Sequence, residues 1–131
     1  MFHQEIHSDL APKAIGPYSQ GIKVGDFVYL SGMLPVNPET GLIESSDIKE
    51  QTQQVFNNIL AVLSSLGCDL SHVVKTTVYM KDLSMFSDSL QEVDAANERR
   101  FARAGHADDA VNVALVDGKI DILEGFDGLR F

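Results

Sequence analysis

Two closely spaced turn signals in the first third of the chain constrain its fold more than any other feature. Gly16-Pro17 predicts a turn, because Gly tolerates positive φ while Pro fixes its own φ and lacks a backbone donor. Gly25-Asp26 separates two segments that favour extended structure, Ser19–Val24 and Phe27–Ser31. The pattern predicts a β-hairpin, and Gly32 directly after it permits close approach of a backbone or a ligand.

A long amphipathic helix is predicted from Asp47 to Gly67. Asp47 can cap its N-terminus, and Glu50 follows three positions later as in a capping box. Gly67 is a typical helix stop. The helix should therefore lie across one face of a sheet. Its apolar stripe consists of Ile48, Val55, Phe56, Ile59, Val62, Leu63 and Leu66, and its polar face of Lys49, Gln53, Gln54, Asn57 and Asn58.

The remaining segments alternate strand and helix signals. Residues 1–11 favour an edge strand, and Val73–Met80 is a β-branched run that predicts another strand. Val36–Ser46 contains loop dipeptides and is expected to be a connection with little chemistry. A second helix is predicted from Asp82 to about Ala104, before Gly105. Two final strands, Val111–Val116 and Lys119–Leu123, should form a hairpin around Asp117-Gly118.

These elements favour one α+β domain spanning residues 1–131, with a mixed six-stranded sheet and two helices on one face. A chain of 131 residues with 44% hydrophobic and 22% charged residues suits a single core. No third helix is predicted for the other face of the sheet, which suggests oligomerisation.

Charge and composition exclude several partners. The net charge of −9 argues against binding to nucleic acid or to anionic lipid. The longest apolar runs are too short for a transmembrane helix, and the N-terminus lacks a secretory pattern. One cysteine cannot form an internal disulfide. A cytoplasmic protein with no membrane partner is the expectation.

Common catalytic arrangements are poorly supported by the residues. His3 and His7 would stand about 13 Å apart along a strand, too far for one ion, so no metal site is predicted. Cys68 has no basic neighbour and is interpreted as a buried or merely exposed thiol. Ser19 and Ser31 have no evident His and acid partners. The glycine spacing matches no nucleotide-binding loop, so no cofactor is predicted.

Three motifs resemble those of a known family. Gly16 to Gln20 reads Gly-Pro-Tyr-Ser-Gln, Ser31 to Pro35 reads Ser-Gly-Met-Leu-Pro, and Val73 to Asp82 is similar to the family's central strand. The chain thus resembles the RidA family (reactive intermediate deaminase A, also called YjgF or liver perchloric-acid-soluble protein). The resemblance implies a chorismate-mutase-like fold and a homotrimer with small-molecule clefts between subunits. It also implies cofactor-free hydrolysis of imines to carbonyl compounds and ammonia.

The resemblance assigns roles to several residues. Tyr18, Ser31 and Gly32 fall on positions that line the family's cleft, although Tyr18 could equally pack at a subunit contact and Gly32 could simply end a strand. Met33 stands where the family usually has Gln, and Gln91 falls near an Asn that often lines the cleft. The catalytic Glu, which helps to position the hydrolytic water, falls on Asp121, or on Glu124 if the alignment slips.

The largest departure concerns the arginine that holds the substrate carboxylate in this family. The equivalent segment carries Asp108 and Asp109, with Asp108 in place of that Arg. A carboxylate there would repel a carboxylate ligand by on the order of a few kcal/mol at a partly shielded site and would favour neutral or amine-bearing substrates. A nearby arginine could instead supply the missing cation; the candidates are Arg99, Arg100 and Arg103. Both aspartates could also be exposed loop residues.

Two hypotheses follow. The first is a divergent imine or enamine deaminase with an altered substrate class, using Tyr18 and Asp121 catalytically. The second is a non-catalytic trimer that binds a small molecule or a protein in the same cleft. RNA cleavage, a further activity associated with the family, fits poorly with the charge of −9.

Overall fold

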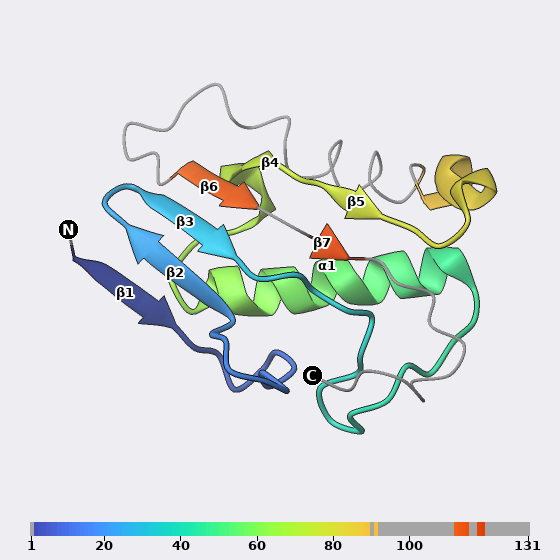
Figure 1. Cartoon of the computed structure of the whole chain (residues 1–131), viewed down its shortest axis with the longest axis horizontal. Coiled ribbons are helices and arrows are strands. Elements are labelled where there is room, and N and C mark those ends of the chain that lie inside the picture. The colour runs from blue at the N-terminus through green and yellow to red at the C-terminus, as the bar shows by residue number, and fades with distance from the viewer. Residues whose placement is uncertain (1, 90, 92–111, 116–117, 120–131) are drawn as a thin grey trace.

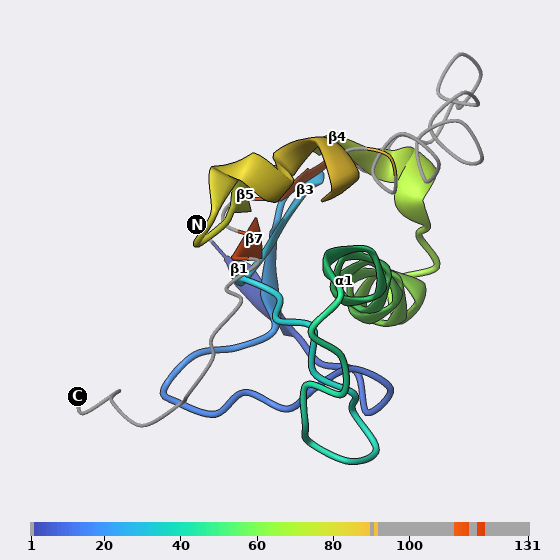
Figure 2. The same ribbon diagram turned by 90° about the vertical axis from the view of Figure 1, so that its right-hand side faces the viewer.

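The computed structural model of the protein describes residues 2–89, 91, 112–115 and 118–119. Its strands are β1 (His3–Ile6), β2 (Gly21–Val24), β3 (Phe27–Leu30), β4 (Val73–Lys75), β5 (Val78–Tyr79), β6 (Asn112–Leu115) and β7 (Gly118–Lys119). Its helices are α1 (Ile48–Ser64) and the 3₁₀ helices η1 (Leu70–His72) and η2 (Leu83–Met85). α1 lies against one face of a five-stranded sheet of order β1-β2-β3-β6-β4 (Figures 1 and 2). The predicted α+β architecture is confirmed.

The hairpin predicted around Gly25-Asp26 is formed by β2 and β3. Val24 pairs with Phe27, so the loop between these strands has two residues. Gly25 has φ +60°, a backbone conformation that is strained for residues with a side chain and that glycine adopts readily. β1 pairs antiparallel with β2 at the edge of the sheet, as predicted for the N-terminal segment. Ile6 is buried and Phe2 is exposed.

The core lies between α1 and the sheet. Val28 and Leu30 of β3 are buried together with the apolar stripe of α1, of which Leu66 alone is only partly buried. Asp47 caps α1 through its carboxylate, which accepts hydrogen bonds from the backbone N–H groups of Lys49 and Glu50. Such a cap stabilises a helix by about 1 kcal/mol. Gly67, at φ +70°, follows the end of the helix, as the sequence predicts.

The strand predicted over Val73–Met80 is interrupted. β4 and β5 are separated by residues 76–77, and the pairing of β4 with β6 shifts register between Val73 and Lys75. The irregular backbone ends the ladder of the main sheet. The strands are consequently divided into a five-stranded sheet and the two-stranded pair β5-β7, rather than joined in the single six-stranded sheet that was expected.

The hairpin predicted around Asp117-Gly118 is wrong. β6 pairs in parallel with both β3 and β4, and β7 pairs in parallel with β5. β5 follows β4 in the chain, and β7 follows β6. Because β6 runs parallel to β4 and β7 runs parallel to β5, β6 and β7 do not form an antiparallel hairpin. Pairing with strands far away in sequence therefore overrides the local turn preference of Asp-Gly.

The second predicted helix starts where expected. The Asp82 carboxylate accepts a hydrogen bond from the Ser84 N–H at 2.9 Å, η2 follows, and residues 86–89 and 91 are α-helical. The rest of that helix and the C-terminal part of the last predicted strand lie outside the described residues.

The two faces of the sheet differ in exposure. Val28 and Leu30 of β3 point toward α1, whereas Phe27 and Tyr29 alternate with them and are 43% and 37% exposed. The face opposite α1 therefore presents aromatic rings to the surface. None of the helices in the described ranges is long and apolar enough to cross a membrane.

Candidate functional site

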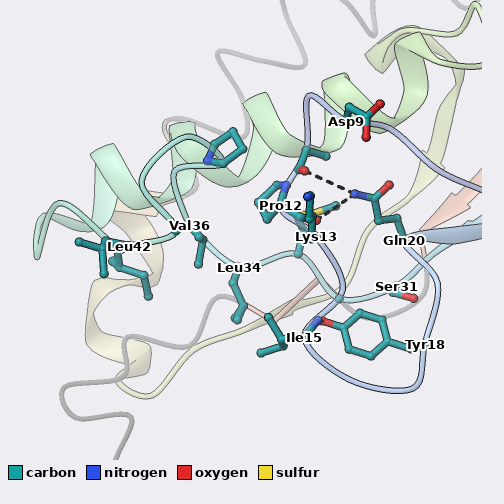
Figure 3. Close-up of a pocket in the computed structure, with 16 residues that line it drawn as sticks. Asp9, Pro12, Lys13, Ile15, Tyr18, Gln20, Ser31, Leu34, Val36 and Leu42 are labelled. Atoms are coloured by element: carbon teal, nitrogen blue, oxygen red, sulfur yellow. Dashed lines mark hydrogen bonds between the residues drawn. The ribbon is translucent and has the colours of Figure 1, made fainter.

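A cavity of about 600 Å³ lies between two segments that flank the β2–β3 hairpin. The first segment precedes β2 and the second follows β3, so the hairpin brings both to the same end of the sheet (Figure 1). Figure 3 shows polar groups of Gln20, Ser31 and Tyr18 on one side and apolar side chains on the other. The described residues that line the cavity are Asp9, Ala11, Pro12, Lys13, Ile15, Tyr18, Gln20, Ser31, Gly32, Met33, Leu34, Val36, Pro38, Gly41, Leu42 and Ile43.

Tyr18 lies in a tight loop at the mouth of this cavity. Its backbone N–H donates to the Gly16 carbonyl at 2.8 Å, and its hydroxyl oxygen accepts from the Ile15 N–H at 3.3 Å. The side chain is 48% exposed. Because the hydroxyl acts as an acceptor within the loop, its proton stays available for donation to a ligand.

Ser31 is held by two hydrogen bonds. Its hydroxyl donates to the Ser19 carbonyl at 2.6 Å, and its N–H donates to the Gln20 carbonyl at 3.0 Å. The hydroxyl proton is therefore already used, and the oxygen can only accept from a ligand. No histidine is among the described lining residues that could act as its general base.

Gly32 and Met33 continue the same wall. Gly32 is exposed, and Met33 is buried to 6% exposure. A thioether contributes apolar, polarisable surface and no donor. The structure thus brings Tyr18, Ser31, Gly32 and Met33 together around one cavity.

Gln20 fixes the first wall, a role that the sequence did not reveal. Its buried side chain accepts from the Ser8 N–H at 2.6 Å and donates to the Ser8 carbonyl at 3.1 Å. It also donates to the Pro12 carbonyl at 2.9 Å (Figure 3). These bonds satisfy backbone groups that would otherwise lack partners on a buried loop. Residues 8–12 are consequently tied to the start of β2.

The second wall corrects an expectation. Residues 36–46 were expected to contribute little chemistry, yet five residues of this segment line the cavity. Asn58, assigned from sequence to the polar face of α1, is 1% exposed and donates to the carbonyls of Leu34 at 3.0 Å and Val36 at 2.9 Å. The helix thereby holds this wall in place. The five residues are Val36, Pro38, Gly41, Leu42 and Ile43.

Other predicted site residues lie elsewhere. The Gln91 side-chain oxygen accepts a hydrogen bond from the Lys49 ammonium at 3.1 Å, and Gln91 is not among the described lining residues. Its place in a cleft between subunits stays a prediction. Asp108, Asp109 and Asp121 lie outside the described residues. So do the alternatives Arg99, Arg100, Arg103 and Glu124.

The described residues offer neither a metal-binding cluster nor an accessible thiol. Among the residues that the structure describes, no group of three or more His, Cys, Asp or Glu side chains could hold an ion. Cys68 is buried, and burial, with a smaller contribution from the Asp69 carboxylate, raises the pKa of its thiol. A thiol with a raised pKa is a poor nucleophile at neutral pH, which agrees with its interpretation as a buried thiol.

Comparisons with known proteins give the family. The family model described as Endoribonuclease L-PSP matches residues 8–122. The chain belongs to this family, which is the RidA/YjgF family. A RutC family protein of Pyrococcus abyssi is 53% identical over 87 residues, covering 66% of this chain and 68% of that protein. Protein DfrA of Myxococcus xanthus is 40% identical over 118 residues, covering 88% and 87%.

Solved structures of the RidA/YjgF family share the fold. The E. coli YjgF gene product gives a TM-score of 0.69 at 28% identity, covering 90% of this chain and 83% of that one. E. coli TdcF, solved with bound serine, gives a TM-score of 0.68 at 25% identity, also covering 90% and 83%. These likenesses agree with the chorismate-mutase-like fold implied by the three motifs.

Proposed function

We propose that the cavity lined by Tyr18, Ser31 and Gly32 is the ligand cleft of a divergent RidA-type enzyme that hydrolyses small imines or enamines. The observation that supports this most is the meeting of these residues at one cavity that is polar on one side and apolar on the other. Small-molecule sites have this composition, with a few placed polar groups on an apolar lining. A relative of the same fold, TdcF, was solved with serine, a small amino acid.

The reaction needs no cofactor. Water adds to the carbon of a C=N bond, the nitrogen takes up a proton, and the carbon–nitrogen bond breaks to give a carbonyl compound and ammonia. Tyr18 can donate its hydroxyl proton toward the nitrogen, and Ser31 can accept a hydrogen bond from a ligand N–H. Asp121 is proposed to help position the water. In this scheme, hydrogen bonds from the cavity orient the imine, and proton transfer to its nitrogen assists the breaking of the carbon–nitrogen bond.

The cleft is proposed to be completed by neighbouring subunits of a homotrimer. The exposed rings of Phe27 and Tyr29 on the sheet face opposite α1 support such a contact, because burying them is favourable at about 25 cal/mol per Å². Light scattering would test the trimer directly: three copies of the 14.3 kDa chain are expected, and a monomer would refute it.

The alternative is a trimer that binds a ligand without turning it over. One observation favours it: the Ser31 proton is used by Ser19, and the described lining holds no histidine for base catalysis. Binding without turnover would then be the function of the cleft. The two candidates make different predictions in the same assay.

An imine-trapping assay tests the proposal. Imines are generated from amino acids by an amino-acid oxidase, and semicarbazone formation is followed with and without the protein. The wild type is expected to speed hydrolysis of the imine and so to lower semicarbazone formation. The rate of imine hydrolysis should fall at least about 10²-fold in Tyr18→Phe or Asp121→Asn. Tyr79→Phe, at a tyrosine outside both the described cavity lining and the proposed subunit contact, is the matched control and should retain activity. An inert wild type that still binds small molecules would refute hydrolysis and favour the alternative.

A further inference from the structure

Lys13 is a charged residue that lines the cavity, and none of the hydrogen bonds that hold the loop before β2 is made by its side chain. Among the described lining residues the formally charged ones are Asp9 and Lys13. Lys13 has no ion-pair partner among the residues that the structure describes, and it is exposed. Lys13 is the one lysine among the described lining residues, in a protein whose net charge is −9.

Asp9 does not neutralise Lys13 by direct contact. One carboxylate oxygen of Asp9 lies 3.0 Å from the Nε2 atom of His7, and both side chains are well exposed. No ion pair joins Asp9 to Lys13. The positive charge of Lys13 therefore stays available to a ligand, whereas Asp9 already has a partner that can carry a positive charge.

The backbone that carries Lys13 is well positioned. Pro12, the preceding residue, accepts a hydrogen bond from the buried Gln20 side chain at 2.9 Å. The same side chain bonds both backbone groups of Ser8, so the whole wall is fixed relative to β2. A fixed attachment point reduces the conformational entropy lost when the lysine side chain engages a ligand.

The rest of the lining defines what accompanies an anionic group. Figure 3 shows Lys13 between the side bearing Ser31 and Tyr18 and the side bearing Leu34, Val36 and Leu42. An ammonium prefers a carboxylate, and the aliphatic side chains prefer a short apolar chain. The cavity therefore has complementary surfaces for the two ends of a small amphiphilic acid.

We propose that Lys13 is the anion-binding residue of this cavity and selects small organic acids over neutral compounds of the same shape. This inference rests on the proposal that the cavity is the ligand cleft. It differs from the expectation drawn from Asp108, which favours neutral or amine-bearing ligands. The cation would come from the loop before β2 rather than from the C-terminal segment, where the family's anchoring arginine is replaced by Asp108.

Binding of two matched probes tests the inference. The probes are 2-oxobutanoate and its neutral amide, 2-oxobutanamide, titrated by calorimetry into wild type, Lys13→Met and Lys13→Arg. We expect the wild type to prefer the acid, Lys13→Met to lose about tenfold in affinity for the acid only, equivalent to about 1.4 kcal/mol, and Lys13→Arg to retain the preference. Lys81→Met removes an exposed lysine outside the lining and should change nothing.

The outcomes separate this inference from hydrolysis itself. Selective binding of the acid that depends on Lys13, without imine turnover, would retain the anchor and refute the hydrolase. Equal affinity of Lys13→Met for the acid, a preference for the amide in the wild type, or no binding of either probe at millimolar concentration would overturn the anchor. Improved acid binding by Asp108→Asn, with no effect of Lys13→Met, would also overturn it and place the charge selection at Asp108.

Discussion

The side-chain amide of Asn58 donates a hydrogen bond to the backbone carbonyl of Leu34 at 3.0 Å. The second amide hydrogen reaches the Val36 carbonyl at 2.9 Å, and the Asn58 oxygen accepts from Gln54. One buried side chain on α1 thus satisfies two carbonyls of a segment without regular structure. The position of that cavity wall depends on the helix that forms the core.

Replacing Asn58 by Leu should therefore damage both stability and the cavity. The substitution keeps side-chain bulk but leaves the carbonyls of Leu34 and Val36 without their donors, at a cost of about 1–3 kcal/mol in the free energy of unfolding. Urea denaturation measures this loss. Asn57→Leu, on the exposed face of the same helix, is the control and should change stability by less than about 0.5 kcal/mol. Equal effects of the two substitutions would show that the Asn58 bonds contribute nothing specific.

Gln20 should be equally sensitive on the opposite wall. Gln20→Glu keeps the size and the acceptor for the Ser8 N–H, but it points a carboxylate oxygen at the carbonyls of Ser8 and Pro12. Because the carboxylate and the carbonyl oxygens would repel each other in a buried site, the free energy of unfolding should fall by about 2–4 kcal/mol. Hydrogen exchange at the Ser8 amide should become faster. The control is Gln4→Glu on the exposed edge strand. Unchanged exchange at Ser8 in Gln20→Glu would contradict this account.

The elements that were predictable from sequence are those that local chemistry determines. The β2–β3 hairpin follows from a two-residue turn that needs positive φ at Gly25, and α1 follows from the Asp47 cap, the apolar stripe and Gly67. The capping box is only partly formed, since the Asp47 N–H is bonded by the Ser45 hydroxyl oxygen. Neighbouring residues thus compete for the same backbone donor.

Non-local pairing accounts for most of what the sequence did not reveal. The break between β4 and β5 and the parallel placement of β7 depend on which strands lie alongside, and an Asp-Gly pair carries no information about those partners. The site shows the same division. Tyr18 and Ser31 stand out in a motif, whereas buried roles for Gln20 and Asn58 depend on carbonyls 8 to 24 positions away.

The thiol of Cys68 should react slowly in the folded protein. Its side chain is buried, and burial together with the Asp69 carboxylate raises the pKa of the thiol, against a smaller opposing influence of Lys23. At pH 8 a disulfide reagent should modify native Cys68 at least about 10²-fold more slowly than urea-unfolded protein. The exposed control is Ser64→Cys in a Cys68→Ala background, which should react rapidly while folded. Equal rates for the two native thiols would contradict the burial.

The same pKa shift sets the sign of a pH effect on stability. Below the ordinary thiol pKa of about 8.5 both the folded and the unfolded chain keep the proton, so Cys68 makes no pH-dependent contribution. Above it the unfolded chain loses the proton first, because the folded-state pKa is raised. The free energy of unfolding should therefore fall between pH 8 and pH 10 more steeply in the wild type than in Cys68→Ala, as measured by urea denaturation. A parallel pH dependence in the two proteins would show that the folded thiol titrates as freely as the unfolded one.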